Sequence, residues 1–261
     1  MRRYSIAEVR STLKNRDSWW TVYFVDPLAC PLTRLIANHT RVTPNALTVT
    51  SLVIGLGSAV SFAANQLAVG ALLFYVSFLV DCVDGKIARL KGTGSPFGLW
   101  LDYVGDRIRV VFCAAGLAYG QYVLTGDVVY IVLGAVLAVL DLFRYVNAPQ
   151  MKRVREAVHL NSESAAPGEQ VERVPSKRLM PRVNRLLARH RVRSHLISGI
   201  EFHAAVFVVA PLIGAAALLP VSTGASLLLL ANEVFIVYRM WLFTRRAAAP
   251  RESREHALIG G

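Results

Sequence analysis

Four aspartates stand close together in residues 81–106, which read DCVDGKIARLKGTGSPFGLWLDYVGD. Asp81 and Asp84 are three residues apart and Asp102 and Asp106 are four apart, so each pair shares one face of a helix. Converging carboxylate oxygens suit hard divalent cations such as Mg²⁺, which in proteins also takes oxygens from substrate phosphates. Two such ions can stabilise both the attacking and the leaving oxygen of a displacement at phosphorus. The spacing therefore predicts a metal site that handles phosphate.

The alternative interpretation is that these aspartates only pair with basic residues of the same helices, which are Lys86, Arg89, Arg107 and Arg109. An ionised carboxylate in the hydrocarbon of a membrane costs about 2.5–3.5 kcal/mol on insertion scales. Four neighbouring carboxylates also repel one another unless a cation lies between them. Helix-end decoration would not require the shared faces, so we favour the metal site.

Long apolar segments surround this stretch. The 261-residue chain is 54% hydrophobic and 18% charged, with a mean hydropathy of +0.43, whereas soluble domains carry about 25% charged residues. Apolar runs of about 20 residues, the length that crosses a bilayer, occur at 43–64, 68–89, 98–120, 127–147, 199–219 and 223–243. The sequence therefore predicts an all-α integral membrane protein with six transmembrane helices. The second and third spans, joined by a short link, would bring the two aspartate pairs together.

The net charge of +12 is unevenly distributed. Lys and Arg gather in residues 1–42, in 148–198 and after 243, and are absent from the connections at 65–67, 121–126 and 220–222. Cytoplasmic loops carry the excess of positive charge in membrane proteins. We therefore expect a multi-pass protein of the cell membrane with both termini and the aspartate site on the cytoplasmic side. Anionic lipids are expected partners of this charge, and no nucleic-acid-binding motif accompanies it.

Three regions follow from this pattern. Residues 1–42 are predicted to form a cytoplasmic and interfacial segment, with an amphipathic helix anchored by interfacial aromatic side chains. Residues 43–243 would be the six-helix catalytic domain, interrupted by a basic cytoplasmic loop at about 148–198. Residues 244–261 would be a cytoplasmic tail. The three cysteines form no CxxC pair and no even framework, so we interpret each as a buried thiol.

At this point the motif Asp81-x2-Asp84-Gly85-x2-Ala88-Arg89-x8-Gly98-x3-Asp102-x3-Asp106 can be compared with known signatures. It resembles the signature of the CDP-alcohol phosphotransferase family at every fixed position. The resemblance implies Mg²⁺-dependent transfer of a phosphate-bearing, phosphatidyl-type group from a CDP-linked donor such as CDP-diacylglycerol to an alcohol. CMP would be released, in phospholipid biosynthesis. It also implies a six-span homodimer.

The same resemblance implies roles for single residues. Asp81 and Asp102 would bridge two metal ions (Mg²⁺, with Mn²⁺ as the alternative), and Asp84 would bind one of them. Asp106 would bind the other and act as the base on the acceptor hydroxyl. The positions that match donor and nucleotide contacts are Pro44, Asn45, Gly85, Ala88, Arg89, Ser95 and Gly98.

The acceptor is less well defined by the sequence. Arg107, Arg109 and Arg144 are predicted to contact it, which favours a phosphorylated alcohol such as inositol phosphate or glycerol phosphate. The cytoplasmic charge bias predicts the same arginines, and other alcohols, serine among them, share the signature. Asp141 and Arg144 are also spaced to neutralise each other.

Two other functions compete with this one. An aspartate-rich membrane prenyltransferase would usually carry two aspartate-rich motifs, and we find one. A cation transporter or channel would place carboxylates near the midplane and in both halves of the chain. Several further polar or small residues complete the predictions: Glu201 and His203 as interfacial, Asn232 and Glu233 within the sixth span with no assigned role, and Gly116-x3-Gly120 as a helix-packing pattern.

Overall fold

The computed structural model describes residues 3–164, 191–192 and 197–248. These residues form helices and contain no strand, apart from an isolated bridge between Asp17 and Val192. The chain divides into two compact units. The first comprises residues 1–141 and 180–229, and the second comprises residues 142–179 and 230–261. The prediction of an all-α protein is confirmed.

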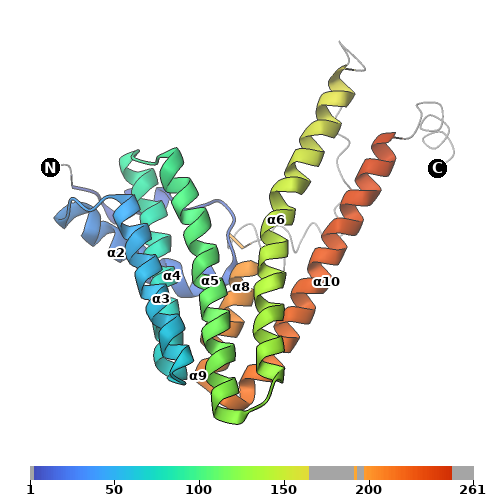
Figure 1. Ribbon diagram of the computed structural model, residues 1–261. Coiled ribbons are helices and arrows are strands. Elements are labelled where there is room, and N and C mark those ends of the chain that lie inside the picture. The colour runs from blue at the N-terminus through green and yellow to red at the C-terminus, as the bar shows by residue number, and fades with distance from the viewer. Residues whose placement is uncertain (1–2, 165–190, 193–196, 249–261) are drawn as a thin grey trace. The chain divides into compact units, whose positions relative to one another are not determined.

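Three long helices form the centre of the first unit: α3 (Pro44–Ala63), α4 (Leu67–Lys91) and α5 (Pro96–Thr125) (Figure 1). The side chain of Thr43 caps α3 and the side chain of Ser95 caps α5, and each cap is followed by a proline at the first helical position. Both patterns are strong helix starts. Helix α4 ends at Gly92, whose φ of 64° is readily adopted by glycine. The link between α4 and α5 is therefore short, and it holds their ends together.

Helices α3 and α5 pack backbone to backbone at two glycines of α5. A Cβ atom on Gly116 would lie 2.2 Å from the carbonyl oxygen of Ala59, and one on Gly120 would lie 2.2 Å from that of Phe62. The predicted packing role of Gly116-x3-Gly120 is confirmed, because only glycine leaves room for the neighbouring helix at both positions.

The close contact makes Gly116→Ala costly. We expect it to lower the free energy of unfolding by about 1–3 kcal/mol, because the added methyl overlaps a backbone oxygen that cannot rotate away. Gly57→Ala is the matched control, since a Cβ there would lie 3.8 Å from Leu73. Thermal unfolding in detergent measures both variants. Equal melting temperatures for the two would contradict the close packing.

The N-terminal segment contains α1 (Ile6–Ser11), the π-helical turn η1 (Thr21–Val25) and α2 (Asp26–His39). Asp26, at the start of α2, is buried and pairs with Lys86 of α4 at 3.0 Å. The segment is thus tied to the helix that carries the first aspartate pair. Lys86, one of the basic residues that the alternative interpretation pairs with the four aspartates, therefore pairs with Asp26. Among the cysteines, all of them free, Cys30 and Cys113 are buried as predicted and Cys82 is only partly buried.

The six predicted spans are matched only in part. The described residues contain five helices long and apolar enough to cross a membrane, and Gly199–Ile213 is a shorter apolar segment. That segment consists of α8 (Gly199–Ala204), η2 (Ala205–Val209) and α9 (Ala210–Ile213), and it replaces the span expected at 199–219. The count of six is therefore not confirmed, but the multi-pass architecture is.

The prediction that the last two spans are connected at residues 220–222 is wrong. The chain turns at Gly214, with a φ of 125°, and α10 (Ala215–Ala248) includes Pro220 in its interior. A φ in this region is open to glycine and strained for other residues, so the break falls at the glycine and not at the proline. The connections α3–α4, α5–α6 and α9–α10 lie at one end of the first unit, and the α4–α5 link lies at the other (Figure 1). The turn at Gly214 also lacks Lys and Arg, so the charge asymmetry is unchanged.

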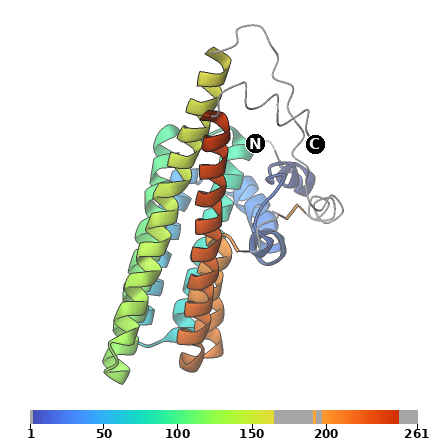
Figure 2. The ribbon, with the colours of Figure 1, turned by 90° about the vertical axis from the view of Figure 1, so that its right-hand side faces the viewer.

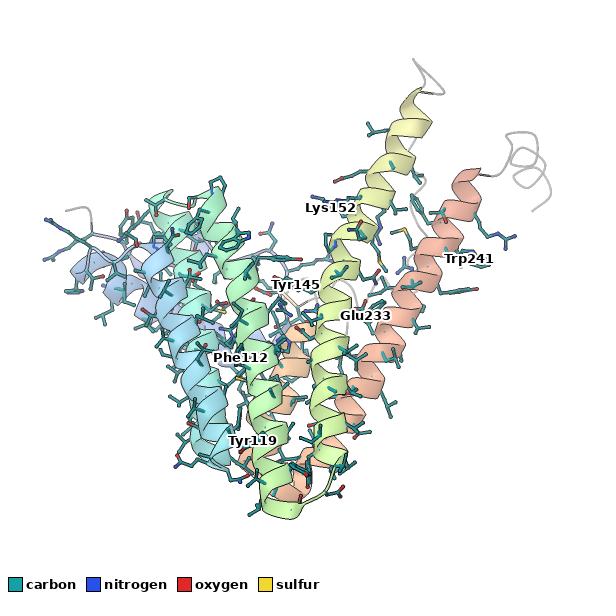
Figure 3. All side chains as sticks on the ribbon, in the orientation of Figure 1. Phe112, Tyr119, Tyr145, Lys152, Glu233 and Trp241 are labelled. Carbon is teal, nitrogen blue, oxygen red and sulfur yellow. The ribbon has the colours of Figure 1, made fainter. Side chains whose placement is uncertain are left out.

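The fourth span is longer than predicted. Helix α6 (Val129–Ser164) continues past residue 147 and through Pro149, so residues 148–164 are helix and not loop. Most of the remaining predicted loop, and the tail after residue 248, lie outside the described residues. The second unit holds the later parts of α6 and α10 (Figure 2). There Asn147 Nδ2 donates to Glu233 Oε2 at 3.2 Å, which gives Glu233 of α10 an interhelical partner (Figure 3).

Candidate active site

Three of the four aspartates converge. Asp81 and Asp84 lie in the last turns of α4 and Asp102 lies in the second turn of α5. Ligand oxygens of these three carboxylates lie within 4.8 Å of one another. We call Asp81, Asp84 and Asp102 the carboxylate triad. Thr48 of α3 donates a 2.6 Å hydrogen bond to Asp84 Oδ2, so a third helix fixes the most buried member.

Asp106 lies outside the triad. Its carboxylate forms a hydrogen-bonded ion pair with Arg109, one turn further along α5, and its other oxygen is 3.8 Å from Arg107. Arg109 also lies 3.7 Å from Asp81. Asp106 is not among the carboxylates whose oxygens lie within 4.8 Å of one another, and its predicted role as a metal ligand stays a prediction.

The triad fits a divalent cation. Three carboxylates at this separation repel one another, and a cation between them offsets that repulsion. Carboxylate oxygens are the ligands that Mg²⁺ and Mn²⁺ take, and Mg²⁺ keeps free positions for water or for substrate phosphates. The residues present are those that a phosphate-handling metal site requires.

Several predicted donor residues lie together at the starts of α3 and α5. A Cβ atom on Gly98 would lie 2.6 Å from Asn45 Oδ1 and 3.1 Å from Ser95 Oγ. Ser95 Oγ accepts a hydrogen bond from the backbone N–H of Gly98 as the α5 cap. Pro44 is the first residue of α3, directly before Asn45. Glycine at position 98 thus allows the side chains of Asn45 and Ser95 to lie close to the start of α5, where a Cβ atom would overlap Asn45.

The other predicted donor residues, Gly85, Ala88 and Arg89, follow the first aspartate pair on α4. A Cβ atom on Gly85 would lie 3.5 Å from Arg89 Nη1, an ordinary contact distance, so Gly85 lies beside the Arg89 side chain. Arg89 Nε donates to the carbonyl oxygen of Thr12 at 2.9 Å, which connects the N-terminal segment to the site.

Two of the three arginines predicted to contact the acceptor have carboxylate partners within the protein. Arg107 pairs with Asp141 of α6, and Arg109 pairs with Asp106. Arg144 belongs to the second unit, and its contact with an acceptor stays a prediction. Asp141 bonds to Arg107 and, at 2.8 Å, to His203 Nε2. Its pairing with Arg144 stays a prediction.

Sequence reasoning missed two buried polar residues of this unit. His203 and Glu201, expected at the interface, are 9% and 4% exposed. Glu201 completes a capping box with Ser198 and accepts from the backbone N–H of Trp19. The Ser198-x2-Glu201 spacing could have revealed the cap. His203 gave no such signal, because its partner is distant in the sequence.

Comparison with known proteins agrees with the site. Residues 41–161 match the profile of the CDP-alcohol phosphatidyltransferase family, a range that includes all four aspartates and every predicted donor residue. These residues form a CDP-alcohol phosphatidyltransferase domain. The resemblance inferred from the motif is therefore confirmed.

Relatives of this domain include an archaetidylinositol phosphate synthase of Pyrococcus horikoshii, 37% identical over 35% of this chain and 48% of its own length. A CDP-diacylglycerol–serine O-phosphatidyltransferase of Helicobacter pylori is 26% identical over 36% of this chain and 42% of its own length. The chain thus spans half or less of these curated relatives. A crystal structure of Mycobacterium tuberculosis phosphatidylinositol phosphate synthase with manganese and citrate aligns with a TM-score of 0.48 and 21% identity, covering 84% of this chain and 89% of that one.

Proposed function

We propose that the protein is a membrane enzyme of phospholipid biosynthesis. With a divalent cation, two Mg²⁺ ions or Mn²⁺ in their place, it transfers a phosphatidyl-type group from a CDP-linked donor such as CDP-diacylglycerol to an alcohol and releases CMP. The observation that carries this proposal is the carboxylate triad, whose ligand oxygens lie within 4.8 Å of one another inside a CDP-alcohol phosphatidyltransferase domain.

The residues of the triad would hold the cation, which supplies charge to neutralise the donor pyrophosphate and the departing CMP. Thr48 fixes Asp84 by its hydrogen bond. We assign nucleotide contacts to Asn45, Ser95 and Gly98, which lie together at the starts of α3 and α5. Arg89, at the end of α4, is placed to give a phosphate oxygen a charge-assisted hydrogen bond.

We assign Asp106 as the base. An alcohol is a poor nucleophile near neutral pH and needs a positioned group to accept its proton. The Asp106 side chain is 24% exposed, more than that of Asp81, which is 15% exposed. The acceptor proton passes to the Asp106 carboxylate while the acceptor oxygen bonds to the phosphorus of the transferred group. The bond from that phosphorus to the CMP oxygen breaks.

The acceptor class is proposed only as an alcohol. Arg107 and Arg109 bond to Asp141 and Asp106, so two of the three arginines that favoured a phosphorylated acceptor are engaged within the protein. The two relatives differ in their acceptors, since one is an archaetidylinositol phosphate synthase and the other transfers to serine. Inositol phosphate, glycerol phosphate and serine are therefore the first acceptors to test.

We further propose that the site and both termini face the cytoplasm and that the protein is a homodimer. The sidedness is supported by the three connections without Lys or Arg, which share the end of the first unit opposite the α4–α5 link. The basic N-terminal segment lies against α4, the helix that carries Asp81 and Asp84. Positive charge marks the cytoplasmic side and attracts anionic lipids. The dimer rests on family resemblance.

The test is release of CMP by the purified protein from a panel of CDP-linked donors, each with inositol phosphate, glycerol phosphate or serine. We expect release from at least one pair, dependent on Mg²⁺ or Mn²⁺ and abolished by chelation with EDTA. Mass spectrometry of the lipid product identifies the acceptor. No CMP from any pair would refute the proposal. Pyrophosphate release from a prenyl diphosphate would indicate a prenyltransferase, and cation flux in liposomes would indicate a channel.

A further inference from the structure

Arg109 is buried at the centre of the first unit, between three helices. Its side chain is 4% exposed. Besides the ion pair with Asp106, its Nη1 donates to Ser51 Oγ of α3 at 3.0 Å and to Ser77 Oγ of α4 at 3.1 Å. The same nitrogen lies 3.7 Å from Asp81. One guanidinium therefore contacts a triad aspartate, the aspartate outside the triad, and two further helices.

The space around Arg109 is shaped for this side chain. A Cβ atom on Gly55 would lie 2.7 Å from both Cγ and Cδ of Arg109, so only glycine admits the arginine stem at that point. The rings of Phe74 and Phe78 lie 5.8 and 6.0 Å from the guanidinium carbon, within the range of cation–π contact. We call this enclosed space the Arg109 slot, and it fixes the guanidinium in place. An arginine that only contributed to the positive charge of a cytoplasmic loop would be exposed.

We propose that Arg109 is a positioning residue for the proposed base. Its ion pair with Asp106 orients that carboxylate toward the acceptor hydroxyl. Its charge beside Asp81 also limits how strongly the triad binds the cation. This inference rests on the proposed function, and it replaces the acceptor contact that the sequence predicts for Arg109.

The physical reason is a fixed charge at short range. A guanidinium stays protonated at any physiological pH, so Arg109 is a permanent positive charge. A positive charge 3.7 Å from Asp81 opposes a divalent cation at the same carboxylate. Removal of this charge should therefore tighten cation binding and, because Asp106 loses its anchor, slow turnover. A general folding defect would weaken both properties together.

The decisive variant is Arg109→Met, which keeps an unbranched side chain in the slot and removes the charge. We expect the dissociation constant for Mn²⁺, measured by electron paramagnetic resonance on the purified protein, to fall by about tenfold. We expect kcat for CMP release to fall by about 100-fold, with little change in KM for the donor. Arg34→Met, at an exposed position of α2, is the matched control and should change neither quantity.

Arg109→Lys tests the geometry separately. Lysine keeps the charge, so Mn²⁺ affinity should stay within about threefold of the parent protein. Its ammonium group lacks the planar geometry with which the guanidinium bonds to two serines and a carboxylate at once. We therefore expect kcat still to fall by about tenfold. An unchanged or weakened Mn²⁺ affinity in Arg109→Met would overturn the inference, as would parental kcat in both variants. If Arg109→Met does not fold, parental kcat in Arg109→Lys overturns it alone. CMP release by the parent protein tests the proposed function independently of Arg109. Mn²⁺ binding tests the role of Arg109 even if no CMP is released.

Discussion

Replacement of Asp106 by asparagine is expected to lower the rate of CMP release by about 10²–10⁴-fold while cation binding stays close to that of the parent protein. The amide of asparagine cannot take a proton from the acceptor hydroxyl, although its oxygen can still accept from Arg109. Because Asp106 lies outside the carboxylate triad, the main cation ligands are untouched. Initial rates of CMP release and a Mn²⁺ titration measure the two effects on one preparation.

Two further variants make this result specific. Asp81→Asn removes a triad carboxylate and should weaken Mn²⁺ binding as well as turnover. Asp127→Asn is the control for the same chemical change, because Asp127 is exposed beyond the end of α5 and asparagine can replace it as a cap of α6. Parental turnover in Asp106→Asn would show that Asp106 is not the base. A loss of Mn²⁺ binding as large as that in Asp81→Asn would place Asp106 among the main ligands.

The parts of the site that the sequence predicted well depend on local geometry. Spacings of three and four residues put each aspartate pair on one helix face whatever the rest of the chain does. Thr43 and Ser95, each before a proline, mark helix starts for the same reason. The short link between α4 and α5 then brings the pairs to one end of the bundle. No knowledge of distant contacts was needed for these steps.

The sequence could not predict which charges meet across helices. Arg109 was assigned to the acceptor because an arginine near a phosphate site is expected to bind phosphate. Its slot depends on Gly55, Ser51 and Ser77, which come from two other helices and carry no pattern that names Arg109. The same limit applies to Asp141, whose partners Arg107 and His203 are distant in the sequence.

Helix lengths were predicted less well than helix positions. Hydropathy detects the part of a helix that lies in hydrocarbon, so the fourth span was expected to end at residue 147 although α6 continues with polar residues to Ser164. The predicted connection lies at 220–222, whereas the chain turns at Gly214 and Pro220 lies inside α10, although proline usually breaks a helix. A glycine conformation with positive φ has no signature in composition.

The second large effect concerns stability. Asp141 is fully buried and joins three elements of the first unit, because Arg107 of α5 and His203 of α8 both bond to this residue of α6. We expect Asp141→Leu to lower the free energy of unfolding by about 3–5 kcal/mol. The leucine fills most of the space but leaves the charge of Arg107 buried without this carboxylate. Thermal unfolding in detergent, followed by the loss of folded monodisperse protein, measures the change.

Two comparisons separate the buried charge from other causes. Asp141→Asn keeps the shape and an oxygen that can accept from one partner. Its free energy of unfolding should therefore fall between that of the parent protein and that of Asp141→Leu. Glu156→Gln breaks an exposed ion pair with Lys152, in which the side chains are 59% and 79% exposed, and should change stability by less than about 1 kcal/mol. If Asp141→Leu were no more harmful than Glu156→Gln, the contacts of Asp141 would not hold α5, α6 and α8 together.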